Sequence, residues 1–351
     1  MKYHSMPSRR SHLQAGVSLV ELMVSLVLGL FLIFGAVTIY SKSRATYRTT
    51  EAVARLQETA RYAFDAIEPD VRMAGYWGLS NRAAYILNRA SSLSDAIPTP
   101  TDNNLDAAAA VIGQCQNNWL VDLDQYIAGR NGSGQTDLGL STDCEAYRDA
   151  WQANTDTLTI RRGSEAAPDE LAVDNLYLQT SRIQGTIFYH TDAACLDPKD
   201  PACIPDAYSP PASETRELLT TMYYVSNESV ARPDVPSLRR KRLVNGAILD
   251  EEVVSGVEDM QVQFGIDTNA DTNADVYVDP QDDPAAYGGT IVSATIWLRV
   301  RADEIEVGFT DDGTYDYADL DAAGEPELAV PNDNFRRFVV SKTIQVRNTR
   351  S

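Results

Sequence analysis

Hydrophobic and polar positions divide the chain into an apolar N-terminal run, an amphipathic stretch and a long remainder with alternating patterns. Residues 17–40 contain a single charged residue, Glu21. The run is long enough to cross the roughly 30 Å hydrocarbon core of a bilayer as a helix. A carboxylate inside a bilayer costs on the order of 3 kcal/mol, which makes Glu21 a candidate functional residue. The run therefore predicts a transmembrane helix over residues 17–40.

The helical pattern continues past residue 40, but its apolar positions then occupy one face only. They recur every three or four residues, as in an amphipathic helix, at Val53, Leu56, Ala60, Ala63, Phe64, Ile67 and Val71. Charged residues occupy the opposite face, and Pro69 disfavours helical geometry at Glu68. We expect one long helix from Val17 to about Glu68, where it ends or kinks.

Several later runs alternate between apolar and polar residues. The clearest are residues 157–161, 185–189, 218–225, 260–266, 292–300 and 338–346. Alternation with a period of two predicts an antiparallel sheet with one buried face. A sheet laid on the apolar stripe of the helix would bury both surfaces. The predicted fold class is therefore α+β, with a long N-terminal helix packed on an antiparallel β-sheet head and an irregular insert over residues 75–154.

The charge balance argues against one class of partner. The chain of 351 residues has a formal net charge of −20. Such a surface repels nucleic acid, which binds through clustered lysines and arginines, so no nucleic-acid partner is expected. One basic run, Arg239 to Arg242, interrupts the acidic chain. We interpret it as the solvated part of a strand or turn that balances nearby acids.

The cysteines indicate the compartment of the head. Cys115, Cys144, Cys195 and Cys203 all lie beyond the apolar run, and their spacing does not match that of a zinc site. An even number of cysteines is better explained by two disulfides in an oxidising compartment. Pairing between nearest neighbours would join Cys115 to Cys144 and Cys195 to Cys203, and the other two connectivities remain open.

Sequence motifs for catalysis are lacking. Beyond residue 16 the chain has one histidine, His190, and it contains no GxSxG, P-loop or HExxH motif. Carboxylates are so abundant that pairs of them carry little information. We therefore expect neither an enzyme nor a bound cofactor.

One acidic segment resembles the start of a calcium-binding loop. Asp267, Asn269 and Asp271 place oxygen-bearing side chains at every second position, and calcium takes 6–8 oxygen ligands. An EF-hand needs glycine where this chain has Thr272 and glutamate where it has Val278. These three residues are therefore weak calcium candidates, and an acidic, solvated hairpin loop between residue 266 and residue 290 is the favoured interpretation.

The N-terminal segment Gly16-Val17-Ser18-Leu19-Val20-Glu21-Leu22 resembles the processing site of type IV prepilins and type II secretion pseudopilins. The resemblance implies that a prepilin peptidase cuts after Gly16, methylates Val17 as the new N-terminus, and leaves Glu21 as the assembly glutamate. The family usually has Phe where this chain has Val17. The preceding leader, residues 1–16, contains three basic residues and no acid.

Two further segments, residues 63–67 and 73–78, resemble minor pilins of the PilW type. The resemblance implies a leader over 1–16, a long helix over 17–70 that crosses the inner membrane once, and a periplasmic pilin head over 71–351. It also implies a minor pilin that initiates or caps a type IV pilus, with other minor and major pilins and the prepilin peptidase as partners. The alternatives are a minor pseudopilin of a type II secretion system and a pilin-borne adhesin or ligand-binding head.

Overall fold

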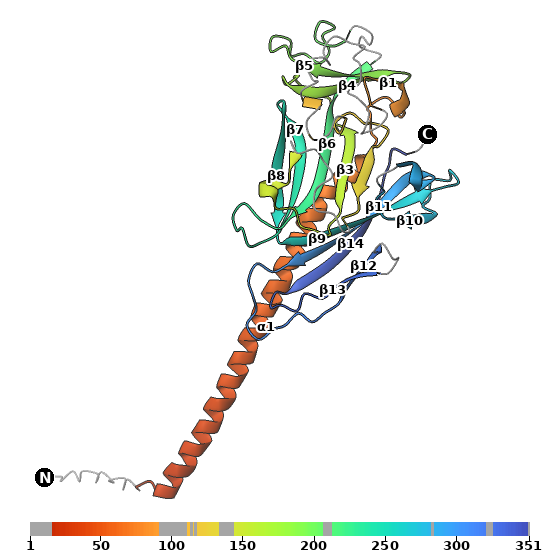
Figure 1. Ribbon diagram of the computed structural model, residues 1–351. Helices are drawn as coiled ribbons and strands as arrows, with labels where there is room; N and C mark the ends of the chain where they lie inside the picture. Colours follow the sequence, from red (N-terminus) through yellow and green to blue (C-terminus); the bar gives the residue numbers. More distant parts are fainter. Residues whose placement is uncertain are drawn as a thin grey trace, which may run out of the picture. The chain divides into compact units, whose positions relative to one another are not determined.

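The structure is a computed structural model that describes residues 16–90, 111–112, 115, 118–132, 144–205, 213–281, 284–320 and 326–349. The leader preceding Gly16 lies outside these residues. Contacts between Cα atoms group the chain into two compact units, Met1–Ala52 and Val53–Ser351. Helix α1 (Leu19–Met73) contributes residues to both units (Figure 1).

Helix α1 begins two residues later than expected and continues five residues beyond Glu68, through Pro69. A proline inside a helix removes one backbone hydrogen bond, so other interactions must hold this turn. Ile67 and Val71 are fully buried on either side of Pro69, and Glu68 pairs with Arg72 and Lys342. The burial of Ile67 and Val71 and the ion pairs of Glu68 therefore account for the helical turn after Pro69, which was not expected from the proline.

The strands are short in the first half of the head and longer in the second. Their bounds are β1 (Ile86–Leu87), β2 (Ile127–Arg130), β3 (Thr157–Gly163), β4 (Asn175–Ser181), β5 (Gly185–His190), β6 (Ser213–Ser226), β7 (Ser237–Val244), β8 (Ala247–Ser255), β9 (Val257–Asp267), β10 (Val276–Val278), β11 (Thr290–Arg301), β12 (Tyr315–Leu320), β13 (Pro326–Ala329) and β14 (Arg337–Gln345). Short 3-10 helices occupy η1 (Ala83–Tyr85), η3 (Tyr147–Asp149) and η5 (Pro284–Tyr287).

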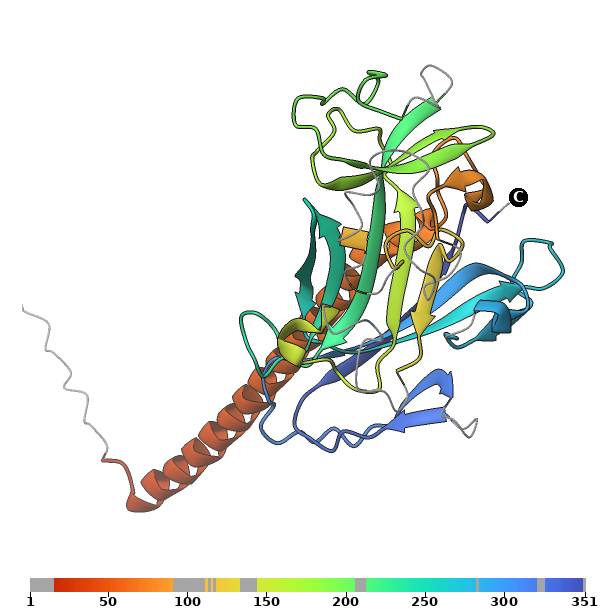
Figure 2. The same cartoon turned by 45° about the horizontal axis from the view of Figure 1, so that its top comes forward.

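Within the described residues these strands form an eight-stranded, a four-stranded and a two-stranded sheet. The eight-stranded sheet has the order β1-β5-β4-β6-β3-β2, and β7 and β8 extend it from β6. Figure 2 shows β7 and β8 beside the long strand β6. The four-stranded sheet has the order β10-β9-β11-β14, and β12 pairs with β13. All of these pairings are antiparallel except that of β1 with β5.

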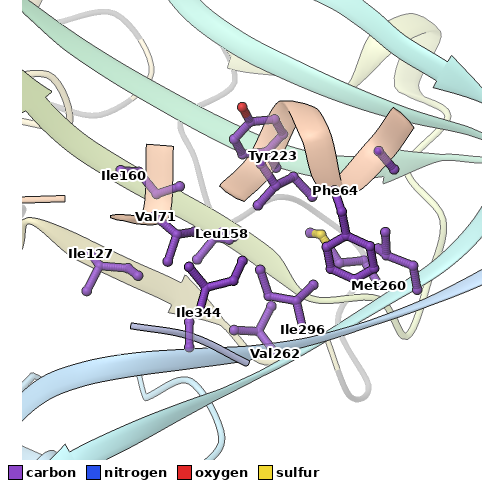
Figure 3. Packing of buried hydrophobic residues seen from close by; sticks show 14 of the residues in the cluster. Phe64, Val71, Ile127, Leu158, Ile160, Tyr223, Met260, Val262, Ile296 and Ile344 are labelled. Atoms are coloured by element: carbon purple, nitrogen blue, oxygen red, sulfur yellow. The ribbon is translucent and has the colours of Figure 1, made fainter. Parts of the chain in front are cut away.

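The C-terminal part of α1 packs its apolar stripe into the main core (Figure 3). The stripe residues Leu56, Ala60, Ala63, Phe64, Ile67 and Val71 are buried together with the inward side chains of β9 and β11. The sheet partners include Met260, Val262, Phe264, Ile296 and Leu298. The α+β fold class is confirmed, with a long apolar N-terminal helix and large antiparallel sheets.

The eight-stranded sheet differs from the expectation of one buried face. Tyr223 of β6 belongs to the main core, whereas Met222 and Tyr224 belong to a second core on the other face. Trp77, Trp119 and Trp151 fill this second core. The described part of the predicted irregular insert is thus a packed layer over the sheet. In β4 and β5 the other face is covered by a third cluster that includes Tyr177, Phe188 and Ile204, so neither strand has the polar face that a half-exposed strand would show.

An ion network attaches the region around β12 and β13 to the four-stranded sheet. Arg337 at the start of β14 is 2% exposed and bonds to Glu258 of β9 at 2.6 and 2.9 Å. It also contacts Asp333 at 2.7 Å and Asp311 at 3.0 Å, and these two acids form an isolated β-bridge. Hydrogen bonds from the Arg337 guanidinium lower the pKa of Asp333 below its usual value.

Replacing a stripe residue tests the packing of α1 on the sheets. Ile67→Ala should lower the free energy of unfolding by about 2–5 kcal/mol, because Ile67 is 0% exposed and the change leaves a cavity. Tyr62→Ala is the matched control on the same helix, since Tyr62 is 58% exposed and its loss should change stability by about 0.5 kcal/mol or less. Denaturation of the detergent-solubilised chain, followed by tryptophan fluorescence, gives both values. Equal losses of unfolding free energy in Ile67→Ala and Tyr62→Ala would contradict the packing of Ile67 in the main core.

The Arg337 network predicts a dependence of stability on pH. The folded-state pKa of Asp333 is lowered, so its contribution is fully present above the unfolded value of about 3.9 and is lost as the pH falls through the folded pKa. Asp333→Asn should therefore reduce the free energy of unfolding at neutral pH and make its decrease below about pH 4 less steep. Asp312→Asn, at an exposed neighbouring position, is the control. If Asp333→Asn and the parent have the same dependence of unfolding free energy on pH, the Asp333–Arg337 pair does not contribute to stability.

Candidate functional site

The residues of the N-terminal motif lie at the start of α1. Gly16, Val17 and Ser18 precede the helix, and Glu21 lies in its first turn. The backbone N–H of Leu22 donates to the Ser18 carbonyl at 3.0 Å, which closes that turn. The first turn of a helix carries a partial positive charge that favours a carboxylate. The backbone itself thus favours an acid at position 21.

Apolar side chains surround this first part of α1 on all sides. Every large apolar residue from Val17 to Tyr40 is exposed, at 48% or more. Among the described residues, α1 is the one helix long and apolar enough to cross a membrane, judged by length and composition. Exposed apolar surface of this extent is unfavourable in water, so this segment requires lipid or other protein chains around it.

Two hydroxyl groups in this segment form hydrogen bonds within the helix. Ser25 donates to the Leu22 carbonyl at 3.0 Å and Thr38 donates to the Phe34 carbonyl at 2.8 Å. The Glu21 carboxylate, in contrast, forms no hydrogen bond or ion pair with any residue that the structure describes. In apolar surroundings it would therefore need a cation or donor from elsewhere.

The weak calcium candidates lie in a tight turn between β9 and β10. The Asp267 carboxylate accepts hydrogen bonds from the backbone N–H groups of residues 269–272, at 2.7 to 3.3 Å. These donors occupy the oxygens that a cation would need. The described ranges contain no group of three or more His, Cys, Asp or Glu residues placed to hold a metal ion. The loop joins β9 to β10, and not to the strand that begins at Thr290 as expected.

The cysteines are paired between nearest neighbours. Cys115 and Cys144 have Cα atoms 4.5 Å apart, and Cys195 and Cys203 have Cα atoms 5.2 Å apart. The first disulfide is buried in the second core, and the second closes a short loop after β5. Both lie in the part of the head that precedes β6.

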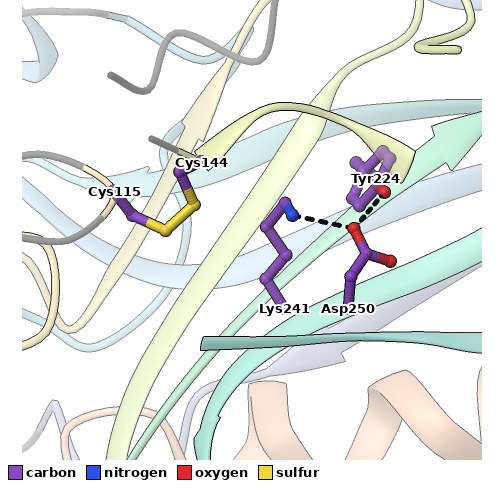
Figure 4. The surroundings of a disulfide bond; sticks show 5 residues. All are labelled: Cys115, Cys144, Tyr224, Lys241 and Asp250. Carbon is purple, nitrogen blue, oxygen red and sulfur yellow. Dashed lines mark hydrogen bonds and ion pairs between the residues drawn. A yellow bond between two sulfur atoms is a disulfide. The ribbon is translucent and has the colours of Figure 1, made fainter. Parts of the chain in front are cut away.

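The expectation that Arg239 to Arg242 are solvated is wrong for half of the run. Arg239 and Lys241 of β7 are buried, and both pair with Asp250 of the neighbouring strand β8. Arg239 Nε and Lys241 Nζ each lie 2.7 Å from this carboxylate, and Tyr224 donates its hydroxyl to it. Figure 4 shows Lys241, Tyr224 and Asp250 near the Cys115–Cys144 disulfide.

The other two basic residues of this run are only partly buried. Arg240 and Arg242 bond to Glu251 of β8 at 3.0 and 2.9 Å. The hydrogen bonds from Arg242 and Arg240 lower the pKa of Glu251. All four cations are therefore neutralised by acids of β8, and they do not form the free basic patch that nucleic acid would require.

Two further arginines position parts of the head and were not predicted. Arg162 of β3 bonds to Asp70 of α1 at 2.8 and 2.9 Å, and Tyr223 donates to the same carboxylate at 2.7 Å. Arg161 is fully buried and donates to the carbonyls of Trp119 and Gln125. These partners are 36 to 153 residues apart in sequence, so no local pattern could have indicated them.

Comparisons with known proteins relate part of the chain to a pilus-assembly family. The family model PilW, described as type IV pilus-assembly protein W, matches residues 222–348. A search of curated proteins finds no match. Among solved structures, the chain is similar to the type IV-like pilin TTHA1219 from Thermus thermophilus, with 14% identity, a TM-score of 0.29, and coverage of 56% of this chain and 79% of that chain.

The matched segment begins within β6 and contains β7 to β14, so it includes all of the four-stranded sheet that packs on α1. The apolar start of α1 and the antiparallel sheets around its C-terminal part are the elements expected of a pilin. The family match itself covers residues 222–348, and over these residues the chain is similar to the PilW family.

Proposed function

We propose that this pilin is a minor subunit that helps to initiate or cap a type IV pilus and enters the filament through its N-terminal helix. The observation that carries the proposal is the single carboxylate in the first turn of an apolar helix. Glu21 has no partner among the described residues, and the apolar side chains after it are exposed. A helix of this kind is suited to association with other apolar helices.

The proposal includes removal of residues 1–16 by a prepilin peptidase. Gly16 lies outside the helix, and a Cβ atom added there would meet no other atom within 4 Å. Open, non-helical backbone is what a peptidase needs at the bond that it cuts. Cleavage after Gly16 would leave a new amine on Val17, which the same enzyme would methylate.

The new amine would supply the cation that Glu21 lacks. It would lie four residues before the carboxylate in its own chain, and the same amine would be present on neighbouring subunits. An ion pair in apolar surroundings is strong because little water screens it, provided that both groups meet. A subunit placed out of register would leave its carboxylate buried and unpaired, so the pair would also set the position of the helix.

The cysteines and the apolar helix support a periplasmic head on an inner-membrane anchor. Disulfides persist in oxidising compartments, and both disulfides of this chain lie in the head. The proposed organisation is a leader over 1–16, a helix over 17–70 with its membrane part over 17–40, and a head over 71–351. Other minor and major pilins are the proposed partners.

The additional layer of the head supports a low-copy role. Described residues between 77 and 151, among them Trp77, Trp119 and Trp151, cover the face of the eight-stranded sheet opposite the main core, and this layer contains the buried Cys115–Cys144 disulfide. A head enlarged in this way is easier to accommodate at the tip of a filament than at every position along its shaft.

Glu21→Ala tests the proposed docking role. The variant should insert into the membrane and lose its leader normally, because it removes a charge from an apolar helix. Its amount in sheared pili, relative to its amount in the membrane, should fall at least about tenfold, since loss of one partner of a buried ion pair costs several kcal/mol. Immunoblots of both fractions give this ratio.

Ser25→Ala is the matched control, because Ser25 lies one turn further along α1 and is satisfied by its own helix. Its ratio between pili and membrane should equal that of the parent. Equal incorporation of Glu21→Ala and the parent would show that helix packing alone sets the register and that the carboxylate has no docking role.

A further inference from the structure

A small exposed surface on the head combines apolar side chains with free positive charge. It consists of Leu79, Arg82, Tyr85, Leu87, Arg182 and Ile183, and we call it the β1 surface. Ile183 is 76% exposed, and the other apolar members are each exposed by 40% or more. Large apolar residues gathered at one place on a head surface need an explanation, whereas scattered ones do not.

The fold brings these residues together at one edge of the eight-stranded sheet. Strand β1 is the terminal strand of its sheet, and its Ile86 is paired with Gly185 at the start of β5 (Figure 1). Ile86 points into the second core, so its neighbours Tyr85 and Leu87 face solvent. Ile183 lies in the turn just before Gly185.

Leu79 and the two arginines complete the surface. The backbone N–H of Leu79 donates to Thr180 of β4 at 3.3 Å, close to the turn that carries Arg182 and Ile183. Arg82 stacks over the Tyr85 ring, with its guanidinium carbon 5.6 Å from the ring centre. A tyrosine and an arginine held against each other are typical of the residues that dominate protein–protein binding.

Charge distinguishes this surface from the rest of the head. Most head arginines form ion pairs with carboxylates, for example Arg162, Arg239 and Arg337. Neither Arg82 nor Arg182 forms an ion pair with any residue in the described ranges. In a chain of net charge −20, two arginines without a carboxylate partner among the described residues, beside one apolar surface, select for an acidic partner.

We propose that the β1 surface is a docking site for an acidic, partly apolar segment of another protein. Anionic membranes and nucleic acids require larger clusters of cations than the two found here. A symmetric contact between two copies of this chain would place the same arginines opposite each other, which is unfavourable. The surface also lies outside residues 222–348, so it is not part of the segment that matches the PilW family.

Site-specific photo-crosslinking in pilus-producing cells tests this proposal on the full chain. A benzophenone amino acid would replace Ile183, and in a second strain Val307, which is 94% exposed in the loop between β11 and β12. We expect an adduct with another protein from position 183 and not from position 307. The crosslinked peptide of the partner should contain more Asp and Glu than Lys and Arg.

Charge reversal in the same crosslinking strain separates docking from simple proximity. Arg82→Glu with Arg182→Glu should reduce the adduct by about tenfold, whereas Arg82→Lys with Arg182→Lys should retain most of it. Both pairs of changes are at exposed positions, so membrane level and the unfolding midpoint should match those of the parent. Absence of an adduct, an adduct insensitive to charge reversal, or an adduct with lipid or with a second copy of the chain would each overturn the proposal. Because the readout is independent of Glu21, it does not depend on the proposed role in filament entry.

Discussion

The apolar side chains of α1 have to leave water, and the chain itself covers only those in the C-terminal part of the helix. Ala63, Ile67 and Val71 are 0% exposed in the main core, whereas Phe31 and Phe34 remain more than 70% exposed. This difference in burial explains why one part of the helix belongs to the head and the other part needs apolar surroundings. The covered part packs against the sheets of the head, and the uncovered part requires lipid or other protein chains around it.

The head is organised in layers that follow from this first contact. The main core joins α1 to the four-stranded sheet and to one face of the eight-stranded sheet. The second core then covers the other face of the eight-stranded sheet with residues from the predicted insert. The segment that matches the PilW family contains the four-stranded sheet, and both disulfides precede it in the sequence.

An element or site residue could be predicted from the sequence where a pattern among neighbouring residues indicates it, and could not where it depends on contacts between distant residues. The C-terminal part of helix α1 and strands such as β9 and β11 were predicted from the periodic spacing of their apolar residues, and the N-terminal part of α1 from its long apolar run. Strand β4 was missed because three consecutive residues, Leu176, Tyr177 and Leu178, are all apolar and buried, so its sequence does not alternate. The side chains of β7 were interpreted as solvated because the burial of Arg239 and Lys241 against β8 could not be identified from sequence. Glu21 was identifiable because a lone carboxylate in an apolar run is a local signal. The pairing of Arg162 with Asp70, and the unpaired state of Arg82, depend on contacts between distant residues.

The central claim is that the chain enters a filament as a processed pilin whose new N-terminus lies one helical turn from Glu21. The most direct measurement is the intact mass and N-terminal sequence of the protein recovered from sheared pili of cells with an active prepilin peptidase. The account predicts a chain that begins at Val17 and lacks residues 1–16, with an additional methyl group on the amine. A chain in the pili that still begins at Met1 would contradict it, because Glu21 would then have no adjacent amine to pair with.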